Sequence, residues 1–503
     1  MKKRGGYQWL LILLLALSGG AVMAQVRTPE VAGQFYPSDP KELRGMVDQF
    51  LTAAPENALE GEPIAVLSPH AGYLYSGPVE GYSYHLLKGI SFDTVVVLGT
   101  AHYFPTQKVS VFDGDAYQTP LGEVKTDQEF IRELLAASPL FQSNAKAHQR
   151  EHSVETQIPF LQESLSSFQI VPMVVGSSDF ESYQKIGEAL AGVIQKQQGG
   201  GKKVLLIASS DLSHYPSDED ARVVDSSTLQ ALLTMNPTYF SQINAHWMKQ
   251  GIPQLVCTYC GEGAVTIVMV AAKALGANRA QILRYATSAD VSYGDKSRVV
   301  GYASVAFIKG GEKQKEQFTV SKETQKILLQ MARNAIAEKV GETHRVVPTT
   351  DDPILLQPAA VFVTLKERGE LRGCIGGTEA RLPLEKAVQY FASAAAFNDP
   401  RFRPLNKEEL PQVHIEISIL SPLKRIHSPS EIIPVLHGVV VKQGGRSGLF
   451  LPQVWLETGW TKEVFLDQLC SQKGGFPARA WQEPGTELYI FTVFSLVETF
   501  EMR

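Results

Sequence analysis

One stretch decides the fold that the sequence predicts: Ile64-Ala65-Val66-Leu67-Ser68-Pro69-His70-Ala71-Gly72-Tyr73. It begins with four apolar residues, and short apolar runs containing β-branched residues are typical of strands buried on both faces. In open α/β sheets, ligands bind beyond the carboxyl ends of the strands. His70 lies at that end of its predicted strand. The stretch therefore predicts a buried strand that places a histidine where a functional site is expected.

The same arrangement occurs twice more along the chain. The apolar residues 95–98 lead into Gly99-Thr100-Ala101-His102, and residues 204–208 lead into Ser209-Ser210-Asp211-Leu212-Ser213-His214. One histidine after a strand is usually a capped or surface residue. Three histidines in the same position favour a shared metal or acid/base site, because clustered ionisable groups signal function.

Strand-like runs alternate with helical patterns in the first three hundred residues, which favours a mainly parallel sheet covered by helices, an α/β fold. The predicted strands are residues 64–67, 94–98, 169–175 and 203–208, and the predicted helices are residues 41–53, 79–87, 127–137, 182–195 and 263–275.

Four cysteines are too few for a disulfide scaffold in a chain of this length. They are Cys257, Cys260, Cys374 and Cys470. Cys260 precedes the predicted helix at residues 263–275, and a helix N-terminus favours the thiolate that binds metals. The alternative is a disulfide or redox pair with Cys257, and composition does not decide between the two.

The N-terminus has the pattern of a secretory signal peptide. Met1-Lys2-Lys3-Arg4 is basic, residues 9–17 are apolar but too few to span a bilayer, and Val22-Met23-Ala24 ends in small residues. We expect a signal peptide at residues 1–24, a mature protein exported to the periplasm or outside the cell, and no membrane span.

Charge argues against a nucleic-acid partner. The formal net charge of −5 becomes −8 when the three basic residues of the predicted signal peptide are removed, and no basic stripe is visible. A polar, charged stretch at residues 310–317 indicates a linker. We therefore expect a first domain at 25–309 and a second, smaller domain at 318–503.

Several motifs of the first domain together resemble the Memo family, named for a mediator of ErbB-driven cell motility. The motifs occur in the family's order, at residues 68–73, 99–102, 151–155, 209–214 and Cys260-Gly261. The loop before the second histidine departs from the family's usual Gly-Pro-Ser/Asn-His, because it reads Gly99-Thr100-Ala101-His102. That difference leaves the histidine in place and changes the residues that shape the loop before it.

This resemblance implies a fold similar to the class III extradiol dioxygenases. It also implies a metal site with His70, His102 and Cys260 as ligands, lined by Asp211 and His214. Two imidazoles and one thiolate suit copper or iron, with zinc as a further possibility, and disfavour magnesium and calcium. Three protein ligands leave a coordination position open, as in catalytic sites.

Four polar residues around these ligands are candidates for moving protons or orienting ligands. They are His214, as the proton-transfer residue, Asp211, as its orienting partner, Glu155 and His152. An alternative reading makes residues 151–155 the segment that precedes a helix, with Ser153 and Thr156 as caps and with the charges solvated.

The second domain is predicted to be α+β. Hairpins are expected at residues 359–377 and 438–452, and helices at 321–339, 384–396 and 461–473. Residues 371–376, 398–402 and 451–454 resemble the AMMECR family.

Four residues of the second domain are candidates for an anion-binding or thiol site: Arg372, Cys374, Asp399 and Arg401. The alternative is a tight glycine turn with a buried cysteine acting as a small apolar residue. The two domains in one chain resemble the AmmeMemoRadiSam grouping, which implies a functional link to a radical-SAM enzyme. A signal peptide departs from that grouping, because radical-SAM chemistry needs a reducing cytoplasm.

The leading hypothesis is an exported metal-dependent oxidoreductase, dioxygenase-like, that acts on a small organic substrate. One alternative is a metal- or peptide-binding interaction module without turnover. A third is a metal-dependent hydrolase, in which a zinc-bound water beside His214 attacks an ester or amide. The nucleophile elbow Gly-x-Ser-x-Gly is absent, which argues against a serine hydrolase but not against a metal-dependent one.

Overall fold

The structure is a computed structural model that describes residues 25–54, 59–310, 320–342, 346–347, 352–367 and 370–498. The predicted signal peptide at residues 1–24 and residues 311–317 of the predicted linker lie outside the described residues. Among the helices that are described, none is long and apolar enough to cross a membrane.

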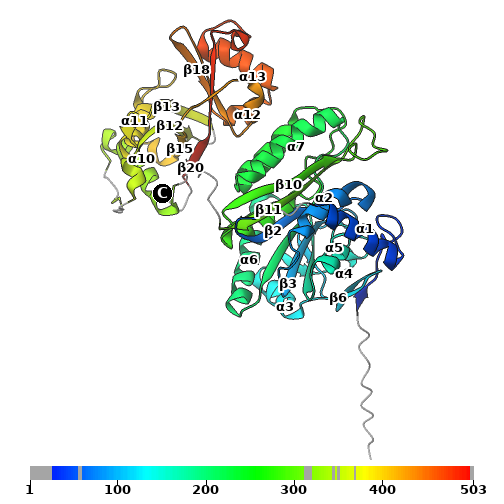
Figure 1. Cartoon of the computed structure of the whole chain (residues 1–503). Helices are drawn as coiled ribbons and strands as arrows, with labels where there is room; N and C mark the ends of the chain where they lie inside the picture. The colour runs from blue at the N-terminus through cyan, green and yellow to red at the C-terminus, as the bar shows by residue number, and fades with distance from the viewer. Residues whose placement is uncertain are drawn as a thin grey trace, which may run out of the picture.

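A mixed eight-stranded sheet forms the centre of the first domain, in the order β10-β11-β2-β9-β3-β8-β4-β7 (Figure 1). The four central strands, from β2 to β8 in that order, are parallel, whereas β11 and β4 join this group antiparallel. The strands are β2 (Glu62–Ser68), β3 (Thr94–Thr100), β4 (Val109–Val111), β7 (Phe141–Ser143), β8 (Gln169–Val175), β9 (Val204–Ser209), β10 (Arg279–Thr287) and β11 (Gly301–Lys309).

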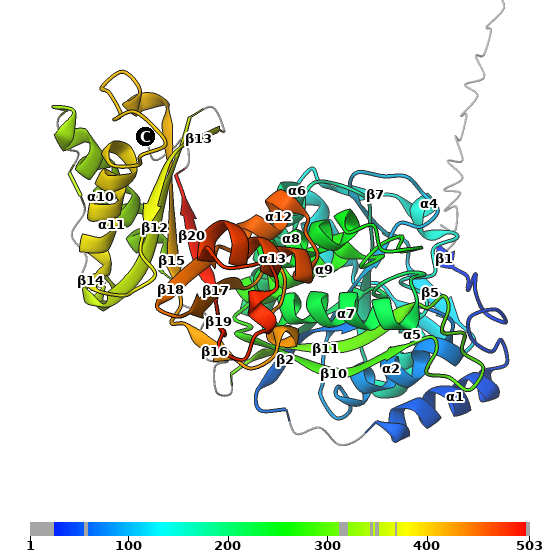
Figure 2. The same ribbon diagram turned by 90° about the horizontal axis from the view of Figure 1, so that it is seen from above.

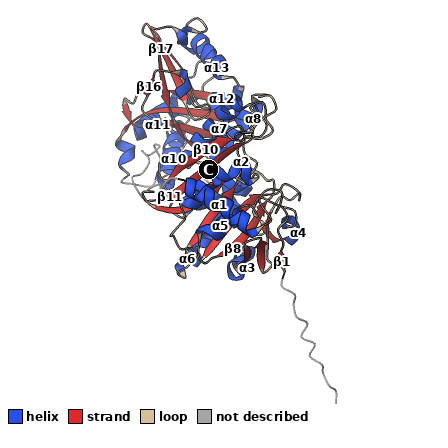
Figure 3. Ribbon diagram, turned by 45° about the vertical axis from the view of Figure 1, so that its right-hand side comes forward, coloured by secondary structure: helices blue, strands red, loops and turns tan. Residues whose placement is uncertain are grey.

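Helices pack on both faces of this sheet and bury two apolar cores, so the domain has three layers (Figure 3). One face carries α1 (Pro40–Ala53), α2 (Tyr73–His85) and α5 (Gln157–Ser164), and the other carries α3 (Gln128–Ala137), α6 (Phe180–Gly199) and α9 (Glu262–Ala274). Around them lie α4 (Ala145–His148), α7 (Asp218–Leu233), α8 (Pro237–Lys249) and a small sheet of β1 (Val26–Arg27), β5 (Ala116–Thr119) and β6 (Gly122–Lys125).

The helix predicted at residues 79–87 begins six residues earlier, because α2 continues through Pro78. Proline has no N–H, so it leaves the carbonyl four residues before it without its helical hydrogen bond. That carbonyl belongs to Leu74, and the hydroxyl of Tyr293 donates to it at 3.2 Å. A side chain from a distant loop thus allows the helix to start directly after the His70 loop.

The second domain has two sheets flanked by helices, in agreement with the predicted hairpins and helices. The first sheet contains β12 (Pro358–Glu367), β13 (Glu370–Gly376), β14 (Leu382–Pro383), β15 (Val413–Leu420) and β20 (Val493–Val497), packed on α10 (Lys322–Lys339) and α11 (Leu384–Phe397). The second sheet contains β16 (Lys424–Ile426), β17 (Gly438–Gln443), β18 (Arg446–Phe450) and β19 (Glu487–Phe491), beside α12 (Gln453–Thr458) and α13 (Lys462–Gln468).

The two domains pack against each other through α8, which lies beside α12 (Figure 2). Ile243 of α8 belongs to the same apolar cluster as Trp455 of α12, and the ring of His246 stands edge-on to that tryptophan. The side-chain amide of Gln250 donates to the carbonyl of Gly459 at 2.9 Å. The two domains therefore share a buried contact.

Candidate metal centre

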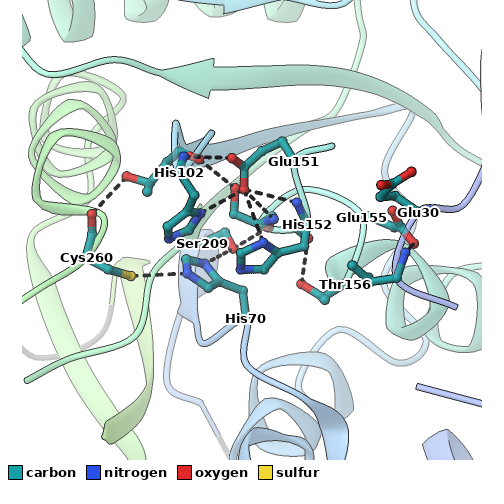
Figure 4. A network of polar contacts seen from close by, with 12 residues as sticks. Glu30, His70, His102, Glu151, His152, Glu155, Thr156, Ser209 and Cys260 are labelled. Atoms are coloured by element: carbon teal, nitrogen blue, oxygen red, sulfur yellow. Dashed lines mark hydrogen bonds and ion pairs between the residues drawn. The ribbon is translucent and has the colours of Figure 1, made fainter. Parts of the chain in front are cut away.

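The carboxyl ends of the central strands bring the predicted residues together. His70 follows β2, His102 follows β3, and Asp211 and His214 follow β9, while Cys260 directly precedes Gly261, the N-cap of α9. One ligand atom from each of His70, His102 and Cys260 lies within 4.8 Å of the other two (Figure 4). Two imidazoles and a thiol that are distant in sequence thus meet at one edge of the sheet.

The tautomer of His70 follows from its neighbours. The hydroxyl of Ser209 donates to the carbonyl of Ser153, so its oxygen accepts from Nδ1 of His70 at 2.9 Å. The lone pair of the ring then lies on Nε2, which is 3.1 Å from Sγ of Cys260. Burial holds the pKa of His70 well below its ordinary value, so the ring is a neutral imidazole.

His102 is oriented by Glu151, whose carboxylate the sequence analysis did not assign to the site. Nδ1 of His102 donates to Oε1 of Glu151 at 2.8 Å, and the backbone N–H of His102 donates to Oε2 at 2.8 Å. Burial alone would raise the pKa of Glu151, but hydrogen bonds from His102 and from backbone N–H groups lower it to about 2. The ionised carboxylate leaves Nε2 of His102 as the free ligand atom.

Cys260 supplies a sulfur that accepts a hydrogen bond from the surrounding backbone. The N–H of Asp211 donates to Sγ at 3.3 Å. Burial raises the pKa of Cys260, so the helix N-terminus does not produce a thiolate by itself, contrary to our expectation. Cys257 and Cys260 are both free thiols in the structure, so the disulfide alternative is not the arrangement observed.

Asp211 and His214 border the same centre. One potential ligand atom of each lies within 4.8 Å of the other and of Cys260. Asp211 accepts the backbone N–H of His70 at 2.8 Å, and Nδ1 of His214 donates to the carbonyl of Leu212 at 2.9 Å. The orienting partner of His214 is therefore this carbonyl, which corrects the expectation that Asp211 has that role. Nε2 of His214 keeps its lone pair.

Glu155 does not fit the catalytic role that we expected. Both of its oxygens are occupied, because the side chains of Arg27 and Tyr36 and the backbone N–H groups of Glu30 and Val31 donate to them. No part of Glu155 is exposed to solvent. This carboxylate therefore joins the N-terminal strand to the domain. The alternative of caps with solvated charges is wrong about the charges, since Glu151 is buried too, whereas Thr156 is indeed the N-cap residue of α5, although its side chain makes no capping hydrogen bond.

His152 lies against the centre and was predicted only as a neighbour. Its ring centroid is 4.5 Å from that of His102, and burial lowers the pKa of His152 to about 3. Phe35 covers the other side, with ring centroids 4.8 Å apart. Phe35 also lines a cavity of about 230 Å³, together with residues 33–37 and Met46, Gly72, Leu74 and Tyr75. None of the three candidate ligands is in this lining, so Phe35 is what connects the cavity to His152.

The candidate residues of the second domain also come together. The N–H of Cys374 donates to Asp399 at 2.8 Å, and Arg401 binds the same carboxylate. Arg372, two residues earlier, pairs with Glu409. Cys374 is half-buried on β13, so the alternative of a buried cysteine in a glycine turn is wrong.

The buried His148 predicts how stability depends on pH. Its ring lies between the hydroxyl of Tyr117 at 2.6 Å and the carbonyl of Ser110 at 2.9 Å, and burial lowers its pKa to about 4. The unfolded chain binds a proton below about pH 6.5, whereas the folded chain does so only near pH 4. The contribution of His148 to the free energy of unfolding is therefore complete above about pH 6.5 and is lost as the pH falls toward about 4.

We expect the free energy of unfolding, measured in urea, to fall by up to about 3 kcal/mol between these two pH values because of His148. His148→Gln should reduce the loss, whereas His427→Gln, at an exposed position, should leave it unchanged. An equal acid sensitivity in wild type and His148→Gln would contradict the assignment.

Comparisons with known proteins match both domains. A family model described as Memo-like protein matches residues 27–306, and one described as AMMECR1 matches residues 329–496. MEMO1 family proteins of Methanocaldococcus jannaschii and Archaeoglobus fulgidus are each 37% identical, over 296 and 284 residues, and each match covers 56% of the chain and 99% of the relative. The structure of an uncharacterized Pyrococcus horikoshii protein matches with 35% identity and a TM-score of 0.33, covering 35% of this chain and 93% of that one.

Proposed function

The chain belongs to the Memo family, and from that premise we propose an exported protein whose first domain binds copper or iron and oxidises a small organic substrate. The proposed ligands are His70, His102 and Cys260. We also propose that the sheet belongs to the class III extradiol dioxygenase type, on the ground that its histidines follow parallel strands.

The observation that carries this proposal is the direction of the three donor atoms. Hydrogen bonds occupy Nδ1 of His70 and Nδ1 of His102, which leaves Nε2 of each ring for a metal. One nitrogen of each ring and Sγ of Cys260 lie within 4.8 Å of one another. Two nitrogens and one sulfur favour copper, iron or zinc over hard cations. The residues present therefore fit a transition-metal ion.

A copper or iron ion bound there supplies electron transfer and an open coordination position. The chain's own residues do the rest. Glu151 and Ser209 fix the two imidazoles, and the cavity beside Phe35 receives the substrate. His214, with Nδ1 held by Leu212, has Nε2 free to take a proton from the substrate or return one.

The test is metal content by mass spectrometry on protein from its exported location. We expect copper or iron in equal amount to the protein, lost in His102→Ala and in Cys260→Ser. His85→Ala should retain the metal, because that ring contacts the carbonyl of Leu51 on another part of the domain. Stoichiometric zinc would favour the hydrolase instead, and wild-type protein without metal would favour the peptide-binding module.

Export and a link to a radical-SAM enzyme are separate parts of the proposal. If the signal peptide is removed as proposed, the mature chain starts at Gln25, and N-terminal sequencing of the exported protein should find that residue. A protein that retains Met1 and remains in the cytoplasm would contradict export and would suit a radical-SAM partner better.

A further inference from the structure

Helix α8 lies between the second domain and the loop that carries Cys260 (Figure 2). Its neighbours include α12 of the second domain and α9, which begins just after Cys260 and Gly261. A single helix therefore contacts both the second domain and the element that follows the proposed metal ligand.

One row of α8 residues, ending at the C-cap, contacts the second domain. Its members are three or four residues apart, which places them on one face of the helix. They are Tyr239, Ile243, His246 and Gln250. The hydroxyl of Tyr239 donates to the carbonyl of Val493, and the side-chain amide of Gln250 donates to that of Gly459 at 2.9 Å. The two residues between them lie against Trp455 or in its apolar cluster, so apolar contact and hydrogen bonds together fix the second domain on this row.

The adjacent row of α8 faces the residue before Cys260. Phe240 follows Tyr239 in the sequence, and its fully buried ring stands edge-on to that of Tyr259, with centroids 4.8 Å apart. Tyr259 is itself buried, and it directly precedes Cys260. A movement of α8 that follows loss of docking therefore reaches Tyr259 through this ring contact.

Hydrogen bonds hold the other side of the Cys260 loop to the segment after β9. The N–H of Gly261 donates to the hydroxyl of Ser210 at 2.9 Å, and the N–H of Cys260 donates to the carbonyl of Asp211 at 3.4 Å. Cys260 thus lies between a fixed segment and the ring of Tyr259. Because a transition-metal ion tolerates a deviation of only about 0.2 Å in its ligand distances, a small displacement of Tyr259 is enough to weaken metal binding.

We propose that docking of the second domain on α8 positions Cys260 for metal binding, and that Phe240 and Tyr259 are the positioning residues. This role of the second domain rests on the proposed function, because it presupposes that Cys260 is a metal ligand. Loss of docking lets α8 and Tyr259 move, so Sγ of Cys260 leaves the position it shares with the imidazoles of His70 and His102. Because coupling between two sites is reciprocal, metal binding in turn tightens the docking.

The first readout needs no metal. Iodoacetamide alkylates the thiols of the metal-free full chain, and peptide mapping by mass spectrometry gives the rate for each cysteine. Tyr239→Phe combined with Gln250→Ala removes two hydrogen bonds between the domains and keeps the apolar contact. We expect this double variant to alkylate Cys260 about tenfold faster than wild type. The rate at Cys470, which is fully buried in the second domain, should stay unchanged.

The second readout is the affinity for cobalt(II), measured by competition with a chelator and by the sulfur-to-cobalt charge-transfer band. We expect the double variant and Trp455→Ala to bind cobalt about tenfold more weakly, with a weaker band. Trp455→Phe should restore part of both, because a phenyl ring keeps part of the apolar contact with the cluster of Ile243. A loss of stability alone would leave the band of folded, metal-loaded molecules unchanged.

Trp481→Ala is the matched control. The indole N–H of Trp481 donates to Asp467 at 2.7 Å within the second domain, and the ring packs against the same apolar cluster as Trp455. The variant therefore removes an indole from that cluster but no residue of α12, and it should bind cobalt as wild type does.

Four results would overturn the proposal. They are a wild-type alkylation rate of Cys260 in the double variant, equal acceleration at Cys470, unchanged cobalt affinity, and the same loss of affinity in Trp481→Ala. Circular dichroism of each variant shows that the fold is retained. Wild-type protein that binds no metal would instead contradict the proposed metal centre, and the alkylation rates would still decide whether the second domain positions Cys260.

Discussion

Replacing Glu155 with alanine is expected to lower the free energy of unfolding by about 3–5 kcal/mol, because it leaves the guanidinium of Arg27 buried without its counter-ion. Arg27 is 5% exposed and Glu155 is fully buried. The same change removes the acceptor of the Tyr36 hydroxyl and of two backbone N–H groups. Urea denaturation of the full chain, followed by tryptophan fluorescence and by hydrogen exchange in the first domain, measures the loss.

The matched control is Glu163→Ala, which removes a surface pair with Arg44, half of whose side chain is exposed. Exposed pairs contribute only about 0–1 kcal/mol. Metal binding per folded molecule should be retained in Glu155→Ala, since that carboxylate has no contact with the three proposed ligands among those described. A loss of stability no larger than that of the control, together with loss of metal, would restore the catalytic role for Glu155.

Replacing Glu151 with glutamine is expected to weaken metal affinity about 10- to 100-fold, the usual effect of losing an orienting partner of a ligating histidine. The carboxylate accepts Nδ1 and the backbone N–H of His102, and the N–H groups of His152 and Ser153. A glutamine side chain turns one of these acceptors into a donor, so at least one N–H group faces another. The neutral amide oxygen also accepts from Nδ1 of His102 more weakly than a carboxylate does, so the ring is held less firmly.

Competition with a chromophoric chelator measures this affinity in the purified full chain. Glu123→Gln, at an exposed position on β6, is the matched control and should bind as wild type does. Melting temperatures without metal show how much of the effect is due to folding. An unchanged affinity in Glu151→Gln would mean that His102 is not a ligand through Nε2.

The parts of the fold that the sequence predicts are those with a local signal. The strands that end before His70, His102 and Asp211 are continuous apolar runs, and each is found in the structure at nearly the predicted bounds. The start of α2 was missed because proline usually breaks a helix, and the hydroxyl of Tyr293 that compensates for it lies 219 residues along the chain from its acceptor, Leu74. No element was predicted for α7 and α8, whose apolar residues face two different neighbours.

The carboxylates of Glu151 and Glu155 show why the sequence alone does not identify every residue of the metal centre. Glu151 and Glu155 are four residues apart and equally buried, yet one faces His102 and the other faces Arg27. The partner of Glu155 lies on β1, which pairs with β5 some ninety residues later along the chain. Such a long-range pairing leaves no local pattern, so spacing could not tell which carboxylate joins the metal centre.

The most direct test of the proposed metal centre is the absorption spectrum of the protein loaded with cobalt(II). Direct coordination of a thiolate gives a sulfur-to-metal charge-transfer band in the near ultraviolet. We predict this band in wild type and in Cys257→Ser, and its loss in Cys260→Ser. A band that persists in Cys260→Ser, or that is absent from the wild type when cobalt is bound, would contradict coordination by Cys260.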